Sequence, residues 1–206
     1  VSLISLFSLA YNDATDTAYT GYVISMWVWT GAAYFVCSCI HHIHGRVDVG
    51  LICRYFIGVC VAQCFVALLN EFIPVINTII NKFIINENQA YLIAVDRMYG
   101  IGAAFDTAGT RFSCALIMIA YCLTAMGKNM RAPTICAYVL SFIFISVVGN
   151  MIARTTSAGM MIGIIYLIYM NVTPSDIMQS NKNVLKYFVG VIVVSIPVLL
   201  LIYSIP

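Results

Sequence analysis

The sequence predicts an all-α fold, a polytopic bundle of transmembrane helices. Of its 206 residues, 62% are hydrophobic and 9% are charged, whereas a soluble domain is about half apolar and a quarter charged. Ten Lys and Arg and eight Asp and Glu cannot cover a water-soluble surface around so much apolar material. At about 20 apolar residues for each span, the length accommodates about seven spans. The net charge of +2, without a basic tail or patch, gives no reason to expect nucleic acid as a partner.

Seven apolar segments define the expected spans. They cover residues 1–11, 19–40, 51–69, 110–126, 133–152, 157–170 and 187–205. The fifth and sixth segments are so close that 153–156 must form a very tight turn. The chain starts and stops inside apolar runs, so we expect 1–206 to be a single transmembrane domain that is part of a longer protein.

The segment 74–95 has a different pattern from the spans. Over 74–85, apolar residues such as Val75, Ile79 and Phe83 recur at helical spacing, with Asn77 and Asn81 on the other side. This predicts an amphipathic helix in the membrane interface. It is followed by the glycine-rich stretch 96–111, which we expect to be a loop on the outer face.

The distribution of lysine and arginine predicts the orientation, because cytoplasmic loops are enriched in both. Alternating the loops assigns to the cytoplasmic side Arg46, Lys128, Arg131, Lys182 and Lys186, with Arg54 just inside the third span. The opposite side receives most of the acidic residues and, at the edges of spans, three arginines: Arg97, Arg111 and Arg154.

These three arginines are the candidate substrate-binding residues. Each lies beside a bend rich in small or hydroxyl side chains, and a guanidinium binds phosphate or carboxylate through a planar fork. Arg111 and Arg154 also precede or begin spans, whose helix N-termini offer unpaired N–H groups to an anion. The predicted site for a phosphorylated lipid comprises Arg97, Arg111 and Arg154 with Gly100, Gly102, Asp106, Thr155 and Ser157. The alternative is that the arginines extend to lipid head groups or pair with Asp96 and Asp106.

Histidine and cysteine predict neither a metal site nor a disulfide framework. His41, His42 and His44 match no zinc spacing and indicate a polar turn at the membrane surface. The eight cysteines lie in or at the edges of spans, where they act as small packing residues. Gly159 and Gly163 form a small-xxx-small pair and predict close helix packing. We expect no metal and no other cofactor.

Two stretches resemble a known family. DRMYGIGAAFDTAGTRFS (96–113) and GNMIARTTSAG (149–159) each run into an apolar span. In order, spacing and predicted side they resemble the O-antigen ligase and O-antigen polymerase superfamily, in particular members from Bacteroides-type bacteria. The resemblance covers about 90–170. Arg97 and Arg154 match the family's motif arginines, and Arg111 is a third candidate.

The resemblance implies a metal-independent, multi-pass glycosyltransferase of the bacterial inner membrane. Such proteins move a glycan from undecaprenyl pyrophosphate to an acceptor sugar at the periplasmic face. Expected partners are therefore that lipid-linked glycan, membrane lipids and candidate surface-polysaccharide assembly proteins. The family's ligases use a histidine in a late outer loop, which this sequence lacks, so no general base is assigned. Two alternatives stay open: a transporter or flippase for an anionic lipid-linked substrate, and a structural subunit of a membrane complex.

Overall fold

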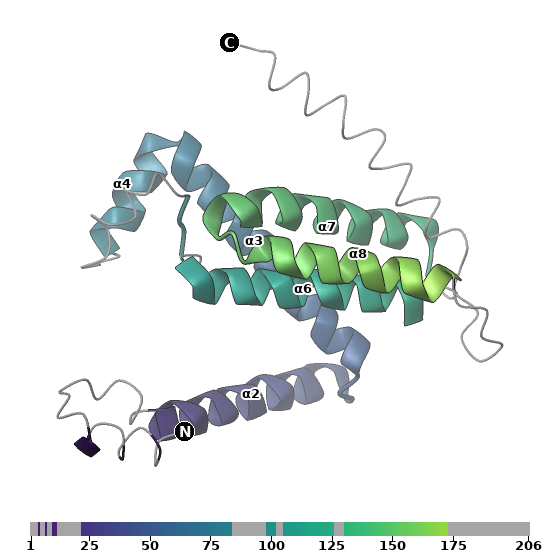
Figure 1. The fold of residues 1–206 in the computed structure, drawn as a ribbon, viewed down its shortest axis with the longest axis horizontal. Helices are drawn as coiled ribbons and strands as arrows, with labels where there is room; N and C mark the ends of the chain where they lie inside the picture. Colours follow the sequence, from purple (N-terminus) through teal and green to yellow (C-terminus); the bar gives the residue numbers. More distant parts are fainter. Residues whose placement is uncertain are drawn as a thin grey trace, which may run out of the picture. The chain divides into compact units, whose positions relative to one another are not determined.

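The computed structural model describes Ile4, Phe7, Ala10 and Tyr11 and the residues 22–83, 98–101, 105–125 and 130–172. Every regular element within these ranges is an α-helix (Figure 1). The chain divides into two compact units, Val1–Ile52 and Cys53–Pro206. The division falls inside helix α3 (Val49–Phe72), and each unit is described by itself.

The first unit contains α2 (Tyr22–His44), an apolar helix without Asp, Glu, Lys or Arg. Ile40 is its one buried side chain among those described from Ile24 onward. His41, His42 and His44 lie in its last turn, so our expectation of a loop at the histidines is wrong. The helix ends at Gly45, whose φ of 68° is left-handed and whose N–H donates to the His41 carbonyl at 2.7 Å.

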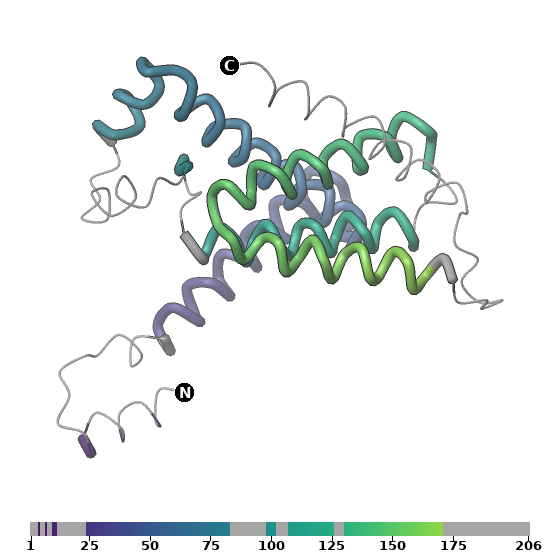
Figure 2. The backbone as a smooth tube through the Cα atoms, turned by 45° about the horizontal axis from the view of Figure 1, so that its top comes forward, coloured from purple at the N-terminus to yellow at the C-terminus, as the bar shows by residue number. Residues whose placement is uncertain are grey.

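The second unit is built on α3, α6 (Phe105–Ala125), α7 (Ala132–Ile152) and α8 (Thr156–Val172). Helices α6, α7 and α8 lie side by side in two views, and α6 packs on both of the others (Figures 1 and 2). Their shared core includes, from these helices and α3, Phe112, Leu116, Ile119, Leu123, Val139, Phe142, Ile145, Leu167, Cys60 and Cys64. Buried cysteines thus serve as packing residues, as the sequence predicted.

Small residues set the distance between α6 and α8. Gly159 lies against the backbone and side chain of Ser113 on α6. A Cβ at Gly163 would lie 3.2 Å from the Phe142 ring and 3.4 Å from the Leu116 carbonyl oxygen. Because apolar helices gain little hydrophobic energy from each other in lipid, close backbone approach supplies the contact instead. The packing predicted for Gly159 and Gly163 is confirmed.

Helix α4 (Pro74–Phe83) follows α3 and is amphipathic, as predicted. Val75 and Ile79 are exposed, whereas Asn77 and Asn81 are half-buried and face other residues of the same unit. Its location in a membrane interface stays a prediction, and 84–95 lies outside the described residues.

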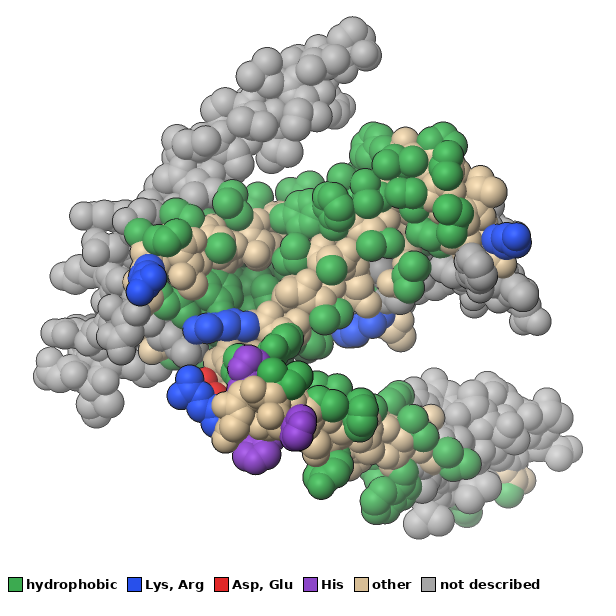
Figure 3. Space-filling model, turned by 180° about the vertical axis from the view of Figure 1, so that it is seen from behind, with side chains coloured by type: hydrophobic (Ala, Val, Ile, Leu, Met, Phe, Trp, Pro, Cys, Tyr) green, Lys and Arg blue, Asp and Glu red, His purple; other side chains and the backbone are tan. Residues whose placement is uncertain are grey.

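Within the ranges that the structure describes, four helices are long and apolar enough to cross a membrane: Ile24–His44, Val49–Phe72, Thr107–Ala125 and Ala132–Ile152. A shorter apolar helix, Thr156–Met170, corresponds to the predicted sixth span. On the face shown in Figure 3, hydrophobic side chains are spread over all the described helices in view, and Lys and Arg occur as separate spots. These features indicate an α-helical membrane protein. The predicted spans 1–11 and 187–205 lie largely or wholly outside the described residues.

Candidate anion-binding site

The structure describes part of the predicted site. Arg111, Arg154, Thr155, Ser157 and Gly100 lie in the described ranges. Arg97 and Gly102 lie outside them, and Asp106 is described only as part of the α6 backbone. The start of α6 and the α7–α8 turn meet at one end of the second unit, which we call the Arg154 end. The opposite end, where α7 starts, is called the Arg131 end.

The α7–α8 turn is tight, as predicted. Ala153 is extended, with φ −147° and ψ 123°, and its N–H donates to the Gly149 carbonyl at 2.8 Å. The hydroxyl of Thr156, a fully buried residue, donates to the same carbonyl at 3.0 Å. The Gly149 carbonyl thus accepts the last i→i−4 bond of α7 and, in addition, a hydroxyl bond that ties the start of α8 to the end of α7.

Helix α6 holds this turn in place. The Ser113 hydroxyl donates to the Thr155 carbonyl at 2.9 Å. A Cβ at Gly109 would overlap the Thr155 hydroxyl and lie 2.8 Å from the Ala153 Cβ, so only glycine allows the contact. Gly109 is therefore a packing position within α6. Our expectations of a loop over 96–111 and of a bend at 109–111 are wrong for 105–111, because these residues already belong to α6.

Arg154 is exposed at the top of the turn. Its carbonyl accepts hydrogen bonds from the Ser157 hydroxyl at 2.7 Å and the Ser157 N–H at 3.1 Å. Its guanidinium makes no hydrogen bond or ion pair within the described residues. The backbone of Arg154 is fixed, while its cationic head is available to an anion.

The backbone N–H groups at the start of α8 are already hydrogen-bonded within the turn. The N–H groups of Thr156, Ser157 and Ala158 donate to the carbonyls three residues before them, at 3.1, 3.1 and 3.2 Å. Our expectation of unpaired N–H groups at this terminus is therefore wrong. Tight turns of this kind satisfy the first amides internally, so side chains must supply the contacts to an anion.

Arg111 does not join Arg154 in one cluster. It is half-buried, and its Nε donates to the Thr107 carbonyl at 3.2 Å. At 100° per residue, Arg111 is separated by about 160° around α6 from both Gly109 and Ser113. Both of those residues face the turn, so Arg111 lies on the opposite face of α6. The two arginines share an end of the unit, but the body of α6 lies between Arg111 and the turn that carries Arg154.

Gly100 is buried against α3. A Cβ there would lie 3.0 Å from both the Cα and the backbone nitrogen of Ala67. The close approach of the Gly100 backbone to the α3 backbone explains why a glycine is needed here. A role of Gly100 in binding substrate stays a prediction.

A polar cluster that the sequence reasoning missed fixes the segment after Arg97. The Asn70 amide donates to the Tyr99 carbonyl at 2.9 Å, and the Tyr99 hydroxyl donates to Asn81 Oδ1 at 3.0 Å. The Asn81 amide donates in turn to Asn77 Oδ1 at 2.7 Å. The i, i+4 spacing of Asn77 and Asn81 predicted a polar helix face. No pattern in the neighbouring sequence indicated that Tyr99, 18 residues after Asn81, would bond to this face.

Comparison of the chain with protein-family models, with curated proteins and with solved structures found no match. No group of three His, Cys, Asp or Glu side chains in the described residues could hold a metal ion.

Proposed function

We propose that the protein is an inner-membrane glycosyltransferase of the O-antigen polymerase or ligase type. It moves a glycan from undecaprenyl pyrophosphate to an acceptor sugar at the periplasmic face. The observation that carries the proposal is Arg154, an exposed cation on an immobilised turn at the end of span-length apolar helices. The resemblance of 96–113 and 149–159 to that superfamily supports it.

The chemistry requires stabilisation of a leaving pyrophosphate. Negative charge grows on the phosphate oxygens as the glycosidic bond breaks, and a guanidinium can bind two of these oxygens at once. Stabilisation is strongest when the donor does not reorganise during the reaction. The contacts of Gly109, Ser113 and Thr156 hold the backbone that carries Arg154 and so favour this role.

The other arginines have separate roles in this proposal. Arg111, on the opposite face of α6, contacts a second part of the substrate rather than the same phosphate. Arg97 directly precedes Met98–Ile101, a segment tied to α3 through Asn70 and Tyr99. A lipid-linked glycan is large enough to extend from one face of α6 to the other.

Replacing Arg154 tests the proposal. Arg154→Ala should lower glycan transfer by about 10²–10³-fold, the usual effect of removing one donor to a developing oxyanion. Arg154→Lys should restore only part of the activity, because lysine lacks the planar fork. Arg131→Ala, which removes an exposed arginine at the opposite end, is the matched control and should leave transfer unchanged.

Purified protein in detergent, with a lipid-linked glycan donor and an acceptor, gives the direct assay. Detergent has no compartments, so a transporter or a structural subunit would show no transfer, and that result would refute the proposal. Surface-glycan length in cells then separates the two enzyme types. Loss of long chains alone indicates a polymerase, and loss of all capped core indicates a ligase. Unchanged glycan at normal levels of the Arg154→Ala protein would also refute it.

A further inference from the structure

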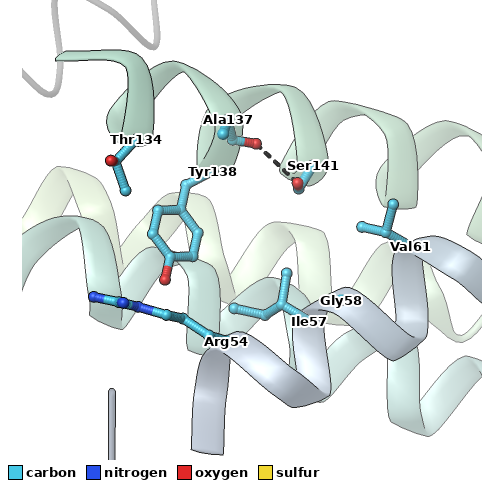
Figure 4. A pocket seen from close by; sticks show the side chains of 8 residues that line it. All are labelled: Arg54, Ile57, Gly58, Val61, Thr134, Ala137, Tyr138 and Ser141. Atoms are coloured by element: carbon cyan, nitrogen blue, oxygen red, sulfur yellow. Dashed lines mark hydrogen bonds between the residues drawn. The ribbon is translucent and has the colours of Figure 1, made fainter. Parts of the chain in front are cut away.

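A pocket between α3 and α7 lies away from the α7–α8 turn, towards the Arg131 end. Its volume is about 360 Å³, and it is lined by Arg54, Ile57, Gly58, Val61, Thr134, Ala137, Tyr138 and Ser141 (Figure 4). The lining positions on each helix follow the i, i+3, i+4, i+7 pattern, so one stripe of α3 faces one stripe of α7. Gly58 and Ala137 leave the space open, and a Cβ at Gly58 would meet no atom within 4 Å.

The polar groups of this pocket are concentrated at one place. Figure 4 shows the Tyr138 hydroxyl directed towards the Arg54 guanidinium, with Thr134 above them. Tyr138 is only 6% exposed, and its hydroxyl lies beside the Arg54 guanidinium and the Cys122 thiol but meets no partner in full hydrogen-bond geometry in the described part of the chain. A buried hydroxyl that lacks a well-formed hydrogen bond costs about 1–3 kcal/mol, so a ligand acceptor at this point is favoured. Ser141 is already satisfied, because its hydroxyl donates to the Ala137 carbonyl at 2.8 Å.

The remainder of the pocket is apolar and parallel to the helices. Ile57, Gly58 and Val61 extend from Arg54 along α3 for about 10 Å, as the helical rise requires. Arg54 is in the second turn of α3, and an arginine so near the end of a span brings its charge to the membrane surface. A phosphate at Arg54 with an acyl chain along Gly58 and Val61 has the orientation of a bilayer lipid.

We propose that this pocket binds the phosphate of an anionic phospholipid, with Arg54 and Tyr138 as donors and one acyl chain along Gly58. The site is separate from the α7–α8 turn and does not depend on the proposed glycosyl transfer. A phospholipid and free phosphate offer the same oxygen acceptors, but only the lipid uses the apolar stripe. Exposed Arg54, Gly58 and Ala137 open the pocket to the surrounding lipid.

Native mass spectrometry of the full chain in mild detergent, titrated with phosphatidylglycerol, measures this binding. Arg54→Gln and Tyr138→Phe should each weaken it, the former by about tenfold, as expected for loss of a charge-assisted hydrogen bond. Gly58→Leu should also block it by filling the stripe without changing a polar group, and its Cβ would meet no atom within 4 Å. Arg131→Gln, an exposed arginine outside the pocket, is the control and should bind normally.

Several results would overturn this assignment. Equal binding of phosphatidylcholine would show that the anionic head is not recognised. Displacement of the lipid by inorganic phosphate at millimolar concentration would assign the pocket to free phosphate. Unchanged lipid binding in Gly58→Leu would place the lipid elsewhere, and this variant decides the question if Arg54→Gln does not fold.

Discussion

Adding a single methyl group at Gly159 should weaken the second unit measurably. In Gly159→Ala the new Cβ would lie 2.8 Å from the Ser113 carbonyl oxygen and closer still to the Ser113 Cα. Both are backbone atoms, so no side-chain rotation relieves the clash and α8 must move away from α6. Overpacking of this kind costs about 1–3 kcal/mol. The Ser113–Thr155 hydrogen bond, 2.9 Å long, would be lost with the movement, at a further cost of about 1 kcal/mol.

Helix propensity opposes part of this loss, because alanine is favoured over glycine by about 1 kcal/mol within a helix. The net expectation for Gly159→Ala is a fall of about 1–3 kcal/mol in the free energy of unfolding. Gly31→Ala, within α2, is the control, since a Cβ at Gly31 meets nothing within 4 Å. Unfolding of both variants by SDS titration, followed by circular dichroism, gives the difference. If Gly159→Ala were as stable as Gly31→Ala, the close approach of α6 and α8 would be refuted.

Two further predictions concern the same helical hairpin. Thr156→Val keeps the shape of the side chain but removes its hydrogen bond to the Gly149 carbonyl, so the free energy of unfolding should fall by about 1–2 kcal/mol; no change in SDS titration would show that the turn does not need this bond. In a background without the native cysteines, Arg131→Cys and Arg154→Cys should react with a membrane-impermeant maleimide from opposite sides of the membrane, because these positions flank the full length of α7. Labelling of both from one side would refute α7 as a span.

Hydrophobic composition was sufficient to predict the class of fold. Long apolar runs predicted the spans of α3, α6 and α7, because a helix that satisfies its own backbone is the main solution available in lipid. The boundaries were less predictable. Helix α6 begins at Phe105 rather than near 110. Gly109 is accommodated within the helix because the α7–α8 turn packs where its side chain would be.

The spatial arrangement of the candidate site could be predicted from the sequence only in part. The sequence correctly placed Arg111 and Arg154 at the same end, because one lies near the start of α6 and the other follows the end of the antiparallel helix α7. It could not show that Arg111 lies on the face of α6 opposite the α7–α8 turn, since that depends on which face of α6 carries Gly109 and Ser113 towards the turn and α8. The proximity of Arg54 and Tyr138 in one pocket was equally hidden, because it joins two helices far apart in the chain.

The short length of α8 has a consequence for the surrounding bilayer. Its apolar part, Thr156–Met170, is about 22 Å long, whereas α7 beside it is about 31 Å long and a hydrocarbon core is about 30 Å thick. Exposed Met161, Ile165 and Ile168 give α8 an apolar outer face. A bilayer responds to a short span by thinning locally, at a fraction of a kcal/mol for each ångström of mismatch. Because α7 and α8 share the turn at Arg154, the shortfall lies at the other end, so lipid head groups beside the end of α8 near Met170 should lie deeper than those beside the start of α7.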